Sequence, residues 1–193
     1  MQLKQYFQQN HNLAAELLEI IDTLFEKTTF EKNEILLKAG DVSDKIYFVE
    51  SGILREFSYS ETEIETVITH WILSENEWIY HSESFRHESS VKSSIQALTK
   101  TQARYIRKSD FERLAQTNEK TVQIILKIYQ QYLSQLDYRN HLHQLRKVED
   151  RLELFEKLQP GLANRVPQFM IASFLNTTPS HLSKVRSKRR LKK

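Results

Sequence analysis

The spacing of apolar residues divides the chain into a helical start, a β-rich middle and a helical end. Leucines and isoleucines at helical spacing predict an amphipathic helix over residues 13–24. From residue 28 to residue 107, short apolar runs alternate with polar turns, which is the pattern of β-strands. The clearest runs are 46–49, 53–59, 65–74 and 94–107. Short strands at this spacing predict a small antiparallel barrel or jelly roll.

After residue 107 the pattern is helical. Residues 119–144 predict one long helix, and residues 147–158 predict a shorter one that ends before a Gln-Pro-Gly turn. Five apolar residues of the long helix follow a 3-4-3-4 spacing, which is typical of a coiled-coil seam: Val122, Ile125, Tyr129, Tyr132 and Leu136. A second stripe, on a neighbouring face, consists of Ile124, Ile128 and Leu133. We expect one face to pack on the β-rich part and the seam to form a homodimer. The alternative is that both faces pack within one chain.

Composition excludes several classes of protein. The chain has 193 residues, no cysteine, three glycines and three prolines. It therefore lacks disulfides, thiolate metal sites and glycine-rich phosphate loops. Its histidines lack the spacing of metal ligands and no catalytic motif is present, so we expect neither a metal site nor an enzyme. No apolar run reaches the roughly 18–20 residues of a spanning helix, and no signal peptide is recognisable. We expect a cytoplasmic protein without membrane contact.

The charge is distributed unevenly. The net charge of the chain is +3, yet residues 158–193 contain eight Lys and Arg residues and no acid. That segment carries +8, so residues 1–157 carry 3 − 8 = −5. A strongly basic end on an acidic body attracts phosphates and favours a polyanion such as nucleic acid.

The basic segment also has the pattern of two short helices joined by a tight turn. Pro167 suits the first position of a helix, and Asn176 tolerates the left-handed conformation that such a turn needs. Thr178 is a good N-cap for the second helix, whose inward face is formed by Leu182 and Val185. This is the pattern of a helix-turn-helix, whose second helix enters the DNA major groove.

Nine residues of this segment are predicted to contact DNA. We expect two of them to position the unit on phosphates, three to face bases, three to add electrostatic attraction, and His181 to touch DNA or cap the helix. In that order, these residues are Gln168 and Thr178; Ser180, Ser183 and Lys184; Arg186, Lys188 and Arg189; and His181.

The sequence resembles the Crp–Fnr superfamily of bacterial transcription regulators, in particular the branch common in Bacteroidetes. The C-terminal resemblance rests on residues 148–152, 165–167, 171–176 and 179–186. Upstream, residues 35–41 and 46–52 resemble the early strands of a cyclic-nucleotide-binding β-roll, and residues 95–98 resemble the strand after its phosphate-binding cassette. The resemblance implies an α+β chain: an N-terminal antiparallel β-roll (jelly roll) with flanking helices (1–117), a long dimerisation helix (118–145) and a helix-turn-helix DNA-binding domain (146–193). It also implies double-stranded DNA, a second copy, RNA polymerase and an unidentified small-molecule effector as partners.

The sequence departs from that family at the cassette. Residues 76–94 contain no glycine, Val91 falls where an arginine is expected, and three glutamates would repel a phosphate. We therefore expect no cofactor and no cyclic nucleotide. Six residues are candidates for a pocket that holds another effector: Trp71, Trp78, Tyr80, Arg86, Lys92 and Ser93. The alternative is that aromatic side chains simply fill the pocket. The β-hairpin wing usual in the family also has no counterpart in residues 158–167.

The favoured hypothesis is a homodimeric, sequence-specific transcription regulator that does not respond to cyclic nucleotide. The alternative is a β-roll signalling module for a small molecule or a protein, whose basic end binds another polyanion such as RNA or anionic lipid.

Overall fold

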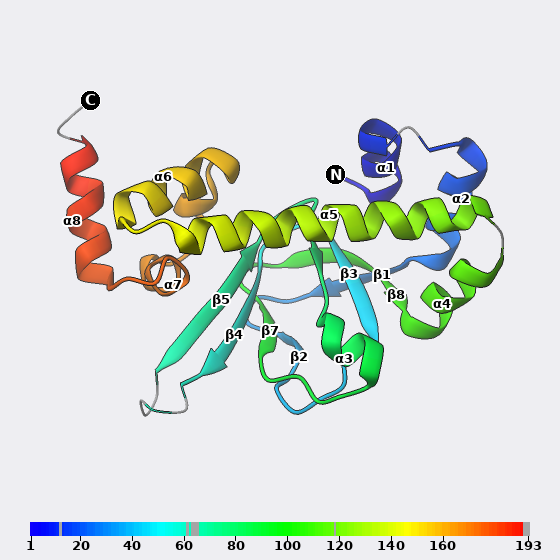
Figure 1. Cartoon of the computed structure of the whole chain (residues 1–193), viewed down its shortest axis with the longest axis horizontal. Coiled ribbons are helices and arrows are strands. Elements are labelled where there is room, and N and C mark those ends of the chain that lie inside the picture. The colour runs from blue at the N-terminus through cyan, green and yellow to red at the C-terminus, as the bar shows by residue number, and fades with distance from the viewer. Residues whose placement is uncertain (12, 61, 63–65, 118, 191–193) are drawn as a thin grey trace.

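The computed structural model describes every residue except 12, 61, 63–65, 118 and 191–193. Two four-stranded antiparallel sheets form a jelly roll, and a long helix runs past it to a helical C-terminal part (Figure 1). The strands are β1 (Glu26–Phe30), β2 (Ile35–Leu37), β3 (Lys45–Ser51), β4 (Leu54–Tyr59), β5 (Val67–Leu73), β6 (Trp78–Ile79), β7 (Ser94–Ala97) and β8 (Thr101–Arg107). One sheet has the order β1-β8-β3-β6 and the other β2-β7-β4-β5.

Helices precede, interrupt and follow the jelly roll. They are α1 (Leu3–His11), α2 (Ala15–Leu24), α3 (Ser82–His87), α4 (Lys108–Thr117), α5 (Glu119–Gln144), α6 (Val148–Leu158), α7 (Gln168–Phe174) and α8 (Pro179–Arg190), with a short 3₁₀ turn at Leu162–Asn164. The α+β class and the jelly roll are as the sequence predicted. Among the described residues, no helix combines the length and the apolar character needed to cross a membrane.

The turn between β3 and β4 depends on Gly52. Its φ is +103°, and a Cβ at this position would lie only 2.7 Å from the Thr101 Cα and 2.8 Å from the Lys100 carbonyl oxygen. A side chain would therefore meet both backbone strain and a backbone clash. This close approach lets the start of β8 pack directly against the turn.

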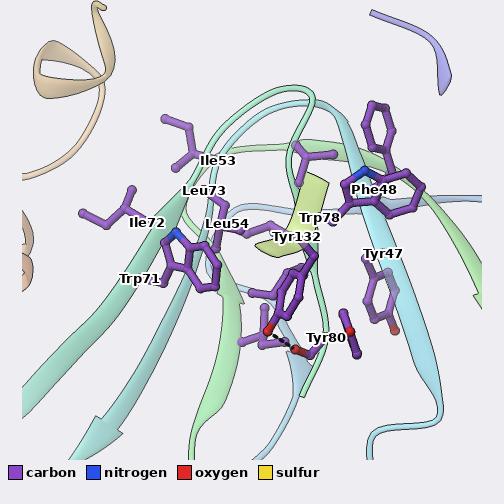
Figure 2. Packing of buried hydrophobic residues seen from close by; sticks show 14 of the residues in the cluster. Tyr47, Phe48, Ile53, Leu54, Trp71, Ile72, Leu73, Trp78, Tyr80 and Tyr132 are labelled. Carbon is purple, nitrogen blue, oxygen red and sulfur yellow. Dashed lines mark hydrogen bonds between the residues drawn. The ribbon is translucent and has the colours of Figure 1, made fainter. Parts of the chain in front are cut away.

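Aromatic side chains fill the interior of the jelly roll (Figure 2). Trp71 and Trp78 are almost completely buried. The Trp78 ring packs against Phe48, with ring centroids 4.8 Å apart, and the Tyr80 and Tyr132 rings are 4.4 Å apart. Burying one such side chain stabilises the fold by roughly 1.5–3 kcal/mol. The interior is thus a packed core.

One face of α5 closes this core. Ile124, Ile128 and Tyr132 are buried, and the Tyr132 hydroxyl donates a hydrogen bond to the Tyr80 carbonyl oxygen (3.1 Å). Gln135 pairs with the backbone of Trp78 in both directions: its Oε1 accepts from the N–H (3.0 Å) and its Nε2 donates to the carbonyl (3.1 Å). These bonds satisfy polar groups of the two-residue strand β6, which lies at the edge of its sheet.

Candidate nucleic-acid interface

The turn between α7 and α8 has the conformation that the sequence predicts. Asn176 adopts a left-handed φ of 50°, and the Thr178 hydroxyl accepts a hydrogen bond from the His181 N–H (3.2 Å). Pro167 lies one position earlier than expected, immediately before α7. The hydroxyl of Thr178 thus pairs one of the N–H groups that a helix start leaves without an intrahelical partner.

The inward side of α8 fixes its orientation. Leu182 and Val185 are buried, as predicted, and join a core with Ile171, Ala172 and Phe174 of α7. The Gln168 side chain donates a hydrogen bond to the Pro179 carbonyl oxygen (3.1 Å). Gln168 and Thr178 therefore stabilise the two-helix unit, and their predicted phosphate contacts stay a prediction.

The outward side of α8 carries a continuous polar stripe, which we call the α8 stripe. It recurs at helical spacing and contains serine and lysine but no acid; its members are Ser180, Ser183, Lys184, Ser187 and Lys188. All five are exposed. Four of them belong to the predicted DNA contacts, and Ser187, which the helical spacing places on the same face, lies one turn after Ser183.

The remaining predicted cations lie on a different side of α8. Arg189 forms an ion pair with Glu156 of α6 (2.9 Å), and Arg186 is half-buried. Arg189 therefore points toward α6 and away from the α8 stripe, and Arg186 also lies outside that stripe. His181 is exposed beside the stripe. Base contacts by this set stay a prediction. The structure separates the outward α8 stripe from Arg189, which pairs with α6.

Helices α6 and α7 are anchored to the jelly roll by polar contacts. Ser173 of α7 accepts a hydrogen bond from the Thr69 N–H of β5 (2.9 Å). Arg165 binds both oxygens of Glu75 (2.6 and 2.9 Å). Burial alone would raise the pKa of Glu75, but hydrogen bonds from Arg165 and the Gly52 N–H lower it to about 2.

A second carboxylate at this junction has the opposite shift. The Gln159 Nε2 lies 3.1 Å from both oxygens of Glu77, and Ser74 donates to the same carboxylate. Burial raises the pKa of Glu77 to about 7, although these hydrogen bonds act in the other direction. Glu75 and Glu77 therefore hold the C-terminal helices in different ways, one as a charged pair and one as a carboxyl group without a cationic partner among the described residues.

The predicted dimer seam is divided between two faces of α5. Ile125 and Tyr132 are buried within the chain, so they are not available to a second copy, and Val122 and Leu136 are half-buried. Large apolar side chains are instead exposed along one line, which we call the outer stripe: Leu126 (51%), Tyr129 (39%) and Leu133 (58%). With Val122 and Leu136 this line has a regular 4-3-4-3 spacing.

The six predicted pocket residues are also separated. Trp71, Trp78 and Tyr80 belong to the packed core, and Arg86 is exposed on α3. Lys92 and Ser93 do line a cleft of about 810 Å³, together with residues of β4, β5, α5 and α7 that the sequence did not single out. The alternative expectation, that aromatic side chains fill the pocket, therefore agrees with the packed interior of the jelly roll.

Comparisons with known proteins agree with this architecture. Residues 27–118 match the cyclic nucleotide-binding domain family. The structure of FixK2 from Bradyrhizobium japonicum aligns with a TM-score of 0.69 at 14% identity, covering 87% of this chain and 85% of that one. The regulator CLP from Xanthomonas campestris aligns with a TM-score of 0.67 at 15% identity, covering 93% of both chains. A putative Crp/Fnr-family transcriptional regulator from Eubacterium rectale aligns with a TM-score of 0.63 at 13% identity, covering 97% and 88%.

A search of curated proteins found no match. The structural alignments nevertheless cover 87–97% of this chain, so they extend beyond residues 27–118. Residues 27–118 thus resemble the cyclic nucleotide-binding domain family, and the chain has the fold seen in FixK2 and in the Crp/Fnr-family regulator from Eubacterium rectale.

Proposed function

We propose that this protein is a sequence-specific DNA-binding transcription regulator that acts as a homodimer. The observation that carries the proposal is the α8 stripe, an exposed line of serine and lysine on a helix whose opposite side is buried. Short hydroxyl side chains can reach base edges in a major groove, and lysines can bind phosphates or guanine. The acid-free segment 158–193 adds the electrostatic attraction.

The outer stripe of α5 supports the homodimer. Leu126, Tyr129 and Leu133 place a line of apolar surface on the exposed side of a 26-residue helix. A parallel pairing of two α5 helices would cover this surface and set two α8 helices on one side of the dimer. We expect half-sites about one helical turn apart, roughly 34 Å, in a palindromic operator.

The packed interior supports a regulator that does not respond to cyclic nucleotide. The indole of Trp71 and the rings of Tyr80 and Tyr132 occupy the space between β-roll and α5 (Figure 2). A nucleotide there would have to displace these rings. We expect DNA affinity to be unchanged by cyclic AMP or cyclic GMP, and a change with either one would contradict this part of the proposal.

Selection of bound duplexes from a random pool tests the main proposal. A recovered palindrome supports a symmetric regulator, whereas unselective recovery would reject sequence-specific binding. On the selected duplex, a dimer that neutralises about 6–10 phosphates should lose about 10³–10⁵ in affinity between 50 and 200 mM salt. A flat salt response would also reject the proposal.

A single substitution tests the α8 stripe. Lys184→Ala should cost about 1–3 kcal/mol on the selected duplex and less on random duplex, if the lysine reads a base. Lys157→Ala is the matched control, because Lys157 is an exposed lysine on α6 outside the stripe. Fluorescence anisotropy measures both affinities. Equal losses for the two variants would place the specific contact elsewhere.

A further inference from the structure

Another large cleft lies where the first helix meets the long helix. Its walls come from α1, the turn between β5 and β6, the second half of α5, and the end of α6 with the residues that follow it, up to Arg165. We call it the α1 cleft. Its volume of about 710 Å³ is in the range of small-molecule sites. In the described chain it shares no lining residue with the cleft that contains Lys92 and Ser93.

Uncharged polar side chains dominate the lining of the α1 cleft. Serine and tyrosine side chains contribute hydroxyl groups, which both donate and accept hydrogen bonds. Other side chains carry a carboxamide, which offers an acceptor oxygen and a donor NH₂ group. The carboxamide residues are Asn10, Asn76, Gln131, Gln135 and Gln159. This lining suits a ligand that makes many hydrogen bonds.

The charged side chains of the lining are largely compensated. Arg165 binds both oxygens of Glu75 (2.6 and 2.9 Å). Burial raises the pKa of Glu77 to about 7, so this carboxyl group is only partly ionised near neutral pH. Burial also lowers the pKa of His11, which keeps its ring neutral. Among its described side chains, the α1 cleft therefore offers an anionic ligand no free cation.

The α1 cleft also gathers buried polar atoms that have no hydrogen-bond partner in the chain. Among the described residues, ten side-chain nitrogen or oxygen atoms are buried in this way, and four of them belong to this lining. They are Asn76 Oδ1, Gln159 Oε1, the Tyr138 hydroxyl and His11 Nε2. Folded proteins pair nearly all such groups, because an unpaired one has lost its hydration without compensation. Four of them around one cleft indicate a place where a ligand completes the pairing.

We propose that the α1 cleft binds an uncharged polyhydroxylated molecule of the size of a mono- or disaccharide. The amide oxygens of Asn76 and Gln159 can only accept, so the ligand has to donate to them. The orientation of the Gln159 amide is fixed, because its Nε2 lies 3.1 Å from both oxygens of Glu77. Sugar hydroxyl groups donate to such oxygens and also accept from the Tyr138 hydroxyl. A ligand held by Asn76 and Gln159 connects the β-roll to the segment that leads to α7.

The α1 cleft stays open in the proposed dimer. Gln131, Gln135 and Tyr138 recur at helical spacing on α5. By that spacing they lie on a side of the helix turned away from the outer stripe, which contains Leu126 and Leu133. Binding in the cleft therefore does not rest on the proposed function.

Saturation-transfer difference NMR on the full chain, without DNA, tests the site. The probes are glucose, maltose and glucuronate, which differ in size and in charge. We expect saturable binding of glucose or maltose, and glucuronate should bind no tighter than glucose because no free cation faces it. Tyr138→Phe and Asn76→Gly should each weaken sugar binding about three- to tenfold, since each removes one hydrogen bond.

Each variant has a matched control elsewhere in the chain. Asn76 and Asn33 both adopt a left-handed φ (71° and 72°), which glycine accepts without strain, so Asn33→Gly makes the same change in an exposed turn. Tyr59→Phe removes an exposed tyrosine hydroxyl at the other cleft. Both controls should keep the wild-type affinity within about twofold, because they are distant from the α1 cleft.

Thermal melts add a readout that separates binding from folding. The Tyr138 hydroxyl has no partner in the folded chain, so Tyr138→Phe should keep or raise the melting temperature while it weakens sugar binding. A clear fall in the melting temperature would mean that the hydroxyl is already paired, and would overturn the proposal. Absence of saturable binding for both glucose and maltose would also overturn it. So would tighter binding of glucuronate than of glucose, or equal weakening in the matched controls.

Discussion

The two faces of α5 carry similar apolar residues in very different surroundings. On the inner face Ile124, Ile128 and Tyr132 are buried against the chain's own β-roll. On the outer stripe Leu126 and Leu133 are more than half exposed. The first group gains its hydrophobic stabilisation when one chain folds. The second can gain it only when something else covers the helix. The inner face therefore stabilises the folded single chain, whereas the outer stripe can stabilise only an association with another molecule.

The largest expected effect is on the inner face. Ile128→Ala should lower the free energy of unfolding by about 2–5 kcal/mol, since it removes a buried side chain and leaves a cavity. Urea unfolding measures the change. Gln123→Ala, at an exposed position of the same helix, should stay within about 0.5 kcal/mol of wild type. A small effect of Ile128→Ala would mean that α5 is not docked as described.

A substitution on the outer stripe should weaken dimerisation and leave the fold of the single chain intact. Leu133→Asp should weaken dimerisation by about 2–4 kcal/mol, about 30-fold or more in Kd, because it places a charge in the centre of the proposed interface. Sedimentation equilibrium measures the dimer, and circular dichroism should show an intact fold. Ser134→Asp adds the same charge next to the outer stripe and should leave the dimer nearly unchanged. A monomeric wild-type protein would refute the proposed pairing.

A smaller effect is expected from Gln135, a polar anchor of the inner face. Gln135→Ala should cost about 1–3 kcal/mol of unfolding free energy, because it leaves the Trp78 N–H and carbonyl without partners. The comparison variant is Gln131→Ala, half-buried on the same helix, which should cost less. The midpoints of urea unfolding of the two variants, each compared with wild type, measure these costs. Equal costs for the two variants would show that the paired bonds contribute nothing specific.

The smallest expected effect is a dependence on pH. The pKa of Glu77 is raised from 4.5 to about 7, so the folded chain keeps a proton that the unfolded chain has lost. Stability from this group is therefore greatest below pH 4.5 and declines as the pH rises through about 7. Glu77→Gln should flatten the decline in unfolding free energy between pH 5.5 and 7.5. An unchanged slope would assign the dependence to other groups.

Local signals predicted the helix-turn-helix unit well. The left-handed Asn176, the Thr178 cap and the buried Leu182 and Val185 all follow from chemistry within a few residues. The bounds of α5 are also as the sequence predicted. Such features need little information from distant parts of the chain, because turns, caps and helical periodicity are properties of short segments.

The hydrophobic pattern of two short strands, β1 and β6, was too weak to predict them from the sequence. In β1, Phe30 is the one buried residue, and β6 is only two residues long. Both strands exist because a neighbouring strand pairs with them, β8 with β1 and β3 with β6. Three of the predicted pocket residues, Trp71, Trp78 and Tyr80, lie in the packed core for a related reason. Trp78 packs against Phe7, Phe25 and Phe48, and two of these come from segments that precede the β-roll.

The sequence alone determined the order of elements, the basic C-terminal segment and the chemistry of the turn before α8. The tertiary structure decided which apolar line of α5 is exposed, which cations of α8 point outward, and that Lys92 and Arg139 line the same cleft. The physical reason is that periodicity places side chains around a helix, but only packing against distant segments selects which of those directions are buried. In the same way, the sequence gives the net charge of a segment. Only the structure shows which individual cations are neutralised by a partner, as Arg189 is by Glu156.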